Sequence, residues 1–259
     1  MRTLCIAVFS LFAALLSGLG PYSYGESAEE SGISFSLAYK CGTEENGKET
    51  EKLCLAGSFK KGLDVVLVTE KGACSAKTED TFTDEYSDAE FQATRLTGAE
   101  DCLTGEDRSV VVVGTDPSAV RFIEPNTDIS ALSKELELKA RKVASSGYQK
   151  IRATQPIRDV AASPPEVFGV GNAAFLLFKS TDDFLNQDGL PVMALREDVF
   201  PLEGACAFRA PFFFSVNGKL HVSYWATVAC CGCGDSQFFV YDLSGESPKL
   251  AYQNSDFSD

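Results

Sequence analysis

"APFFFSVNGKLHVSYWATV" (residues 210–228) contains the strongest structural signal in this sequence. Asn217-Gly218 favours a two-residue hairpin turn, because both residues tolerate the positive φ angles that such a turn requires. After the turn, the even-numbered residues from 220 to 228 are apolar or aromatic and share one face of the predicted strand. The odd-numbered residues point the other way. The stretch therefore predicts an antiparallel hairpin with one face in a core.

Further strands predicted on both sides of this hairpin indicate a mainly β protein. Alternating or β-branched segments at 237–243 and 249–253 extend the hairpin into a four-stranded antiparallel meander. Upstream, alternation at 33–40 leads into Asn46-Gly47, which predicts another hairpin. The expected fold class is mainly β, with antiparallel sheets and one helix around 128–146, that is α+β overall and disulfide-stabilised.

The domain organisation follows from composition. We expect a signal peptide at 1–25, a β-rich N-terminal domain with one helix at 26–155, and an antiparallel β C-terminal domain at 166–259. The proline-rich connector "PIRDVAASPPEV" (156–167) separates the two.

One helix is predicted from a stripe of apolar residues at helical spacing. Asp128 can cap its first turn, and Gly147 stands where a left-handed terminator belongs. Glu135 and Glu137 each precede a basic residue by four positions, which adds a little stability. We expect the helix to pack on a sheet in the first half of the chain. The stripe consists of Leu132, Leu136, Ala140 and Val143.

The first residues indicate export. Met1-Arg2 is followed by an apolar run of signal-peptide length, with a cleavage point expected before Glu26. A retained membrane anchor is the alternative, but Gly18, Gly20 and Pro21 interrupt the run. The protein is therefore expected to be secreted or periplasmic, with no membrane span after cleavage.

The acidic composition limits the classes of partner. The formal net charge is −14, which repels nucleic-acid backbones and anionic lipid surfaces. We therefore expect no nucleic-acid partner. The expected partner is an extracytoplasmic protein or a small ligand.

The cysteines of the exported chain are expected to form disulfides, because extracytoplasmic compartments oxidise thiols. They divide into two groups of four, separated by a long gap after Cys102. In the first group, counting outward from Asn46-Gly47 brings Cys41 within about two places of Cys54. A bridge across that hairpin is therefore natural. The eight disulfide candidates are Cys41, Cys54, Cys74, Cys102, Cys206, Cys230, Cys231 and Cys233.

The second group contains the dense cluster "ACCGCGDS" (229–236). In the register set by the Asn217-Gly218 turn, Cys206 lies opposite Ala229, with a slip expected near Pro211. A bridge from Cys206 into the cluster is thus favoured.

Two alternatives for this cluster stay open. A zinc or copper site needs about four ligands and would use Cys206, Cys230, Cys231 and Cys233. A redox dithiol normally lies at a helix N-terminus, whereas a strand is predicted after this motif.

The sequence contains no recognisable catalytic signature. Its one histidine, His221, is expected on the surface, and neither a nucleophile elbow nor a phosphate loop occurs. The acidic runs at 79–90 and 180–189 are expected to be solvated loops, with calcium binding as the less favoured interpretation. No catalytic residue and no cofactor are therefore predicted.

Aromatic residues gather in the C-terminal meander, where one face must form a core. Two packed layers are the favoured interpretation. The alternative is an exposed aromatic face that binds a ligand. Its candidate residues are Phe213, Tyr224, Trp225 and Phe239.

Together these patterns favour an exported, disulfide-bonded binding or interaction protein of unknown ligand. Two alternatives remain: a secreted hydrolase that uses paired carboxylates, and a metal-binding protein that uses the cysteine cluster.

We predict that all eight cysteines of the exported chain are oxidised. Alkylation of the native, metal-replete protein should label no thiol, and reduction before alkylation should label eight, as read from the intact mass. Four thiols that label without reduction, all within residues 206–233, would instead favour a metal or redox site.

Overall fold

The computed structural model describes residues 33–45, 48–69, 72–86, 89–98, 109–128, 132–152, 160, 162–179, 189–204, 206–207, 210–227 and 236–255. The described chain is mainly antiparallel β with one α-helix, which confirms the predicted fold class. Within these residues, no helix is both long and apolar enough to cross a membrane.

The first six strands form a closed barrel in the order β1-β2-β5-β4-β3-β6. Closure leaves no strand edge unpaired along the barrel. Its interior is a packed apolar core made largely of aliphatic side chains, among them Leu55, Leu67 and Val111. The strands are β1 (Ser34–Glu45), β2 (Lys48–Ala56), β3 (Asp64–Thr69), β4 (Gly72–Tyr86), β5 (Ala89–Thr97) and β6 (Ser109–Val113).

The other strands form a 10-stranded sheet. Its main path runs β16-β15-β14-β12-β10-β9-β8, with β11 beside β10, and β13 between β14 and β7. The short 3-10 helix η2 (Pro117–Ala119) leads from the barrel into this sheet. The strands are β7 (Val120–Ile123), β8 (Glu166–Val170), β9 (Ala173–Lys179), β10 (Gly189–Leu195), β11 (Asp198–Pro201), β12 (Cys206–Ala207), β13 (Phe212–Val216), β14 (Lys219–Thr227), β15 (Ser236–Asp242) and β16 (Lys249–Ser255).

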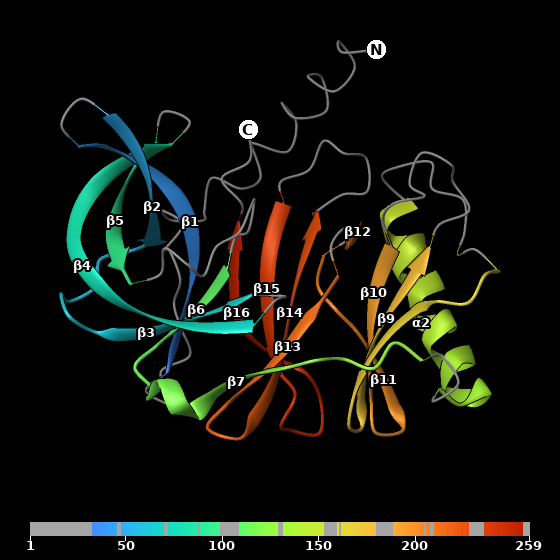
Figure 1. Cartoon of the computed structure of the whole chain (residues 1–259). Coiled ribbons are helices and arrows are strands. Elements are labelled where there is room, and N and C mark those ends of the chain that lie inside the picture. Colours follow the sequence, from blue (N-terminus) through green and yellow to red (C-terminus); the bar gives the residue numbers. More distant parts are fainter. Residues whose placement is uncertain are drawn as a thin grey trace, which may run out of the picture.

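This sheet folds over itself, so that its two halves pack face to face. The ring of Phe175 on β9 lies 5.1 Å from that of Tyr224 on β14, measured between centroids. Figure 1 shows the resulting order of layers: the barrel, then β13–β16, then β8–β11, then the helix α2 (Lys134–Arg152). Three apolar clusters fill the spaces between successive layers.

The hairpin at Asn217-Gly218 forms as predicted. Val216 lies opposite Lys219, and both turn residues have positive φ angles, 51° and 78°. β13, β14, β15 and β16 pair in sequence order, which confirms the four-stranded meander.

The register shifts before this hairpin. Cys206 on β12 lies opposite Thr227, two places from the predicted Ala229. The chain leaves the ladder between β12 and β13 around Pro211, which has no backbone N–H to donate. A slip was expected there, but of one place only.

The first predicted disulfide is present. Cys41 and Cys54 are bonded across the β1–β2 hairpin, with their Cα atoms 5.9 Å apart. The register explains the pairing, because Cys54 lies opposite Tyr39, two places from Cys41. Cys74 is also disulfide-bonded. The remaining predicted pairings involve Cys102, Cys206, Cys230, Cys231 and Cys233, whose side chains lie outside the described part of the chain.

The helix begins later than predicted. The Ser133 hydroxyl accepts a hydrogen bond from the backbone N–H of Leu136 at 3.1 Å, so Ser133 is the N-terminal cap in place of Asp128. The helix continues past Gly147 to Arg152, so Gly147 is not its terminator. The predicted ion pairs are present: Lys139 lies 3.3 Å from Glu135, and Arg141 lies 3.0 Å from Glu137.

The predicted apolar stripe is confirmed, but the surface on which it packs was predicted wrongly. Ala140 and Ala144 are buried against Leu176 and Phe178 of β9, in the second sheet. β7, which also precedes the predicted connector, pairs with β13 of that sheet. The outer face of β9 and β10 carries large apolar residues, among them Leu176, Phe178 and Val192, and their burial under the helix is favourable. The predicted domain boundary itself stays a prediction.

His221 is buried, not on the surface as predicted. It is 4% exposed and lies where the barrel covers β13 and β14. Its ring stacks on Phe214 at 5.3 Å and lies 5.4 Å from Phe35 of β1, measured between centroids. Its Nδ1 atom is 3.0 Å from the Lys219 carbonyl oxygen. Burial lowers the pKa of His221, and the nearby Asp242 carboxylate opposes this shift only in part.

We predict that His221 makes the protein less stable as the pH falls below about 6.5. The unfolded chain then takes up a proton that the folded chain resists, so the free energy of unfolding decreases. Denaturant unfolding at pH 7 and at pH 5 measures this loss.

The variant His221→Phe should lose less stability over the same interval, because it keeps a ring but has no titrating group. Since the chain has one histidine, no second imidazole complicates the comparison. Burial acts to raise the pKa of Asp242, but hydrogen bonds from Ser244 together with the charges of His221 and Lys219 outweigh it, so the pKa is lowered. Its contribution is therefore lost in a more acidic range, below about pH 4. Equal losses in the two proteins would contradict the prediction.

Candidate ligand-binding site

The aromatic residues considered as a ligand face do not form a surface. Phe213, Tyr224, Trp225 and Phe239 are each at most 4% exposed. Trp225 faces the barrel, and the other three fill the layer between the two halves of the sheet. The expectation of an exposed aromatic face is therefore wrong for these side chains, and the interpretation as two packed layers is confirmed. Both faces of the meander are covered, which the pattern of one strand does not reveal.

The polar sites considered from the sequence give no metal site in the described chain. The acidic run at 79–90 is not a loop, because its described residues belong to β4 and β5. Asp84 there accepts a hydrogen bond from the Tyr39 hydroxyl at 2.7 Å. The described residues contain no group of three or more His, Cys, Asp or Glu side chains suited to a metal. The cluster at 230–233 and the run at 180–188 lie outside the described residues.

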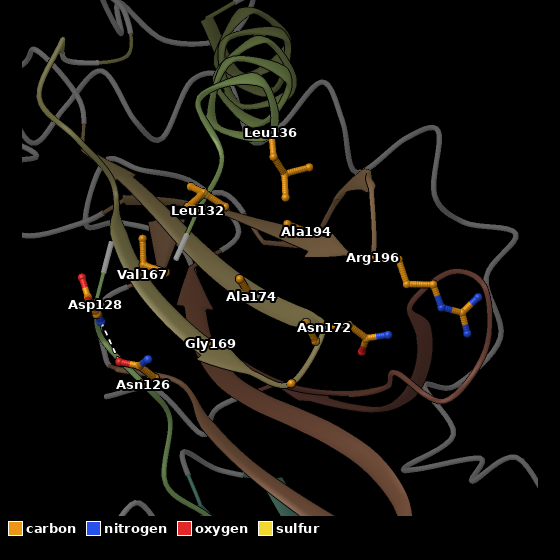
Figure 2. A pocket seen from close by; sticks show the side chains of 12 residues that line it. Asn126, Asp128, Leu132, Leu136, Val167, Gly169, Asn172, Ala174, Ala194 and Arg196 are labelled. Atoms are coloured by element: carbon orange, nitrogen blue, oxygen red, sulfur yellow. Dashed lines mark hydrogen bonds between the residues drawn. The ribbon is translucent and has the colours of Figure 1, made fainter. Parts of the chain in front are cut away.

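A hollow of about 230 Å³ lies near the start of α2, against the face of β8–β10 that the helix covers farther along (Figure 2). We call it the α2 pocket. Twelve residues line it, and they divide into an apolar group and a polar group. The apolar group is Leu132, Leu136, Val167, Gly169, Gly171, Ala173, Ala174 and Ala194, and the polar group is Asn126, Asp128, Asn172 and Arg196.

The floor of the α2 pocket is hollow because one row of the sheet carries small residues. Gly169, Ala174 and Ala194 lie directly opposite one another on β8, β9 and β10. The neighbouring row on the same face contains larger residues, Val167, Leu176 and Val192, and these pack in the cluster under α2. Because these side chains are small, space is left open beside the N-terminus of α2.

The wall of the pocket is held by local hydrogen bonds. The Ser133 cap fixes the first turn of α2, so Leu132 and Leu136 face the small-residue row (Figure 2). On the other side, Asn126 and Gly169 exchange two backbone hydrogen bonds of 2.8 Å each. The Asn126 side-chain oxygen also accepts the backbone N–H of Asp128 at 2.9 Å. The Asn126 side of the opening is therefore bonded to β8, and the opposite side is held by the capped first turn of the helix.

The polar residues stand at two ends of the pocket. Asn126 and Asp128 lie at one end, and Asn172 and Arg196 lie at the other, with the apolar floor between them (Figure 2). The backbone N–H of Arg196 donates to the Asn172 carbonyl at 2.7 Å, which joins the β8–β9 turn to the β10–β11 turn.

Arg196 has an uncommon backbone conformation, with φ at 60° in the left-handed region. In the described part of the chain, its guanidinium group takes part in no ion pair. Arg196 and Glu197 form the two-residue turn of the β10–β11 hairpin, and such turns require a positive φ at their first residue.

The sequence analysis missed this pocket. Its residues come from segments far apart in the chain, and their small side chains carry no motif. In the sequence, Gly169 and Gly171 form only an isolated Gly-x-Gly pair, without the third glycine of a dinucleotide-binding motif. The available signal was the alanines at 173–174 and 194, which interrupt otherwise bulky strands.

The pocket is suited to binding more than to catalysis. The described residues that line it include no serine, cysteine, histidine or lysine that a nucleophile–base pair would need. Asp128 is the one carboxylate among these described lining residues, whereas glycoside hydrolysis uses two. A small pocket with an apolar floor and a few fixed polar groups is typical of a ligand site.

Searches against protein-family models, curated proteins and solved structures find no match to this chain.

We predict that Arg196 does not contribute to stability. The variant Arg196→Gly removes the cost of the left-handed backbone, about 1–2 kcal/mol, and adds about 0.4–1 kcal/mol of disorder to the unfolded chain. Its free energy of unfolding should therefore equal or exceed that of the parent by up to about 1.6 kcal/mol.

The matched control is Arg121→Gly, at an exposed position of β7. Glycine within a strand should cost about 0.5–1 kcal/mol. Denaturant unfolding compares the two variants, and a loss at Arg196 as large as that at Arg121 would contradict the prediction.

Proposed function

We propose that this chain is an exported, disulfide-bonded binding protein that holds a small amphipathic molecule in the α2 pocket. The single observation that carries the proposal is the structure of the α2 pocket itself. A row of small residues opens it, the capped helix walls it, and polar groups stand at its two ends.

The volume of the pocket limits the size of the ligand. A space of about 230 Å³ corresponds to about eight water-sized atoms. Most drug-sized ligands need about 300 Å³ or more, so the α2 pocket suits a smaller molecule. Its apolar floor favours a hydrocarbon body, and its ends favour polar groups.

Two observations support the exported location. The first observation is the apolar leader, which is of signal-peptide length. The second is the Cys41–Cys54 disulfide, because reductants in the cytosol usually keep cysteine thiols reduced. A binding role toward another extracytoplasmic protein remains part of this proposal.

A fragment screen by NMR tests the proposal. The protein is labelled at its alanine methyl groups and mixed with polar fragments of up to about eight non-hydrogen atoms. We expect some fragments to shift the methyl signals of Ala173, Ala174 and Ala194 and to leave those of the barrel unchanged.

The variant Ala174→Leu should abolish these shifts, because the larger side chain fills the hollow. The matched control, Ala73→Leu at an exposed position of β4, should retain them. A screen in which no fragment shifts the pocket methyls, or in which Ala174→Leu binds as well as the parent, would refute the proposed function.

A further inference from the structure

We infer that the ligand of the α2 pocket is a short aliphatic monocarboxylate whose carboxylate group meets Arg196. This inference rests on the proposed function and adds the chemical class of the ligand. Three features of the pocket support it: the charge at one end, the apolar middle and the charge at the other end.

The first feature is the guanidinium group of Arg196. Arg196 lies at the rim of the pocket, where its side chain leads outward from the apolar floor (Figure 2), so a carboxylate that meets it would lie at the mouth of the hollow. In a chain of net charge −14 this guanidinium group forms no ion pair in the described part of the structure. A guanidinium group binds a carboxylate through two parallel hydrogen bonds, which fixes the orientation of the ligand. An organic anion is therefore the partner that this end of the pocket suits best.

The same end is rigid before any ligand binds. The Arg196 backbone N–H is bonded to the Asn172 carbonyl at 2.7 Å, and the side chain of Asn172 stands beside it at the pocket. Joining two hairpin turns in this way reduces the ordering that a bound carboxylate would require.

The second feature is the apolar middle. Leu132, Leu136, Ala174 and Ala194 separate the two polar ends, so a ligand that spans the pocket needs a short hydrocarbon body (Figure 2). The volume of about 230 Å³ admits a short aliphatic chain and excludes a long-chain fatty acid.

The third feature is the carboxylate of Asp128 at the opposite end. It repels a second negative charge, so a dicarboxylate should bind worse than a monocarboxylate of similar length. Arg196 is the one cation among the described lining residues, so a phosphate dianion would also leave charge unbalanced. The arrangement thus selects one negative charge at the Arg196 end.

A titration with four matched compounds tests the inference. Pentanoate, pentanamide, pentylamine and succinate are each titrated into the full exported chain, with the alanine methyl signals as readout. We expect pentanoate to bind at least about tenfold more tightly than pentanamide, because it bonds to a charged group. Succinate and pentylamine should bind more weakly than pentanoate.

Variants of Arg196 test whether this residue causes the preference for pentanoate over pentanamide. Arg196→Gln should reduce pentanoate affinity to that of pentanamide and leave pentanamide affinity unchanged. Arg196→Lys should keep a weaker preference for pentanoate, because it keeps the charge and loses the paired hydrogen bonds. The control, Arg121→Gln, should behave as the parent does.

The possible failures are distinguishable. If pentanamide or pentylamine binds as tightly as pentanoate, the ligand class is wrong and the pocket remains a binding site. If succinate binds more tightly than pentanoate, the role of Asp128 is wrong. If none of the four compounds binds, the inference fails, and the fragment screen then decides whether the proposed function fails with it.

Discussion

The central constraint on this structure is that β13–β16 carry large apolar side chains on both faces. Tyr224 and Phe239 point to one side of this layer, and Trp225 and Phe238 point to the other. Each face needs a cover, because leaving such side chains in water costs about 1.5–3 kcal/mol apiece. The barrel covers one face, and β8–β10 cover the other. The four-layer arrangement follows from this requirement.

The α2 pocket lies at the outer edge of the same arrangement. The helix buries the large row at Leu176 but begins beside the small row formed by Gly169, Ala174 and Ala194. A core that served stability alone would fill such a hollow, since interiors are normally packed to crystal density. The hollow is instead bordered by fixed polar groups. Its position outside the main layers allows a ligand to enter without disturbing the core.

The sequence predicted the parts of the fold that local patterns control. Three such predictions are confirmed: the Asn217-Gly218 turn, the alternation that follows it and the Cys41–Cys54 bridge. Each depends only on residues within its own hairpin. The first residue of the helix was harder to predict from the sequence, because Asp128 and Ser133 are both good N-terminal caps. Only tertiary packing decides between them.

Long-range packing explains the remaining errors. His221 and Ser223 made one face of β14 look polar, but the barrel, assembled from residues far upstream, covers that face. The sequence did not predict the pocket for a related reason. Gly169, Ala174 and Ala194 meet only through the register of three strands, and small residues have no chemical signature in a sequence.

The closed barrel also has a consequence for biosynthesis. Residues 212–216 and 236–241 are the kind of β-prone, uncharged, aromatic segments that self-associate into cross-β fibres when exposed. The barrel is built entirely from residues 34–113, which are synthesised before residues 212–242. It can close before those hazardous strands emerge and present them with a ready surface. The order of the chain thereby acts as a built-in safeguard against aggregation.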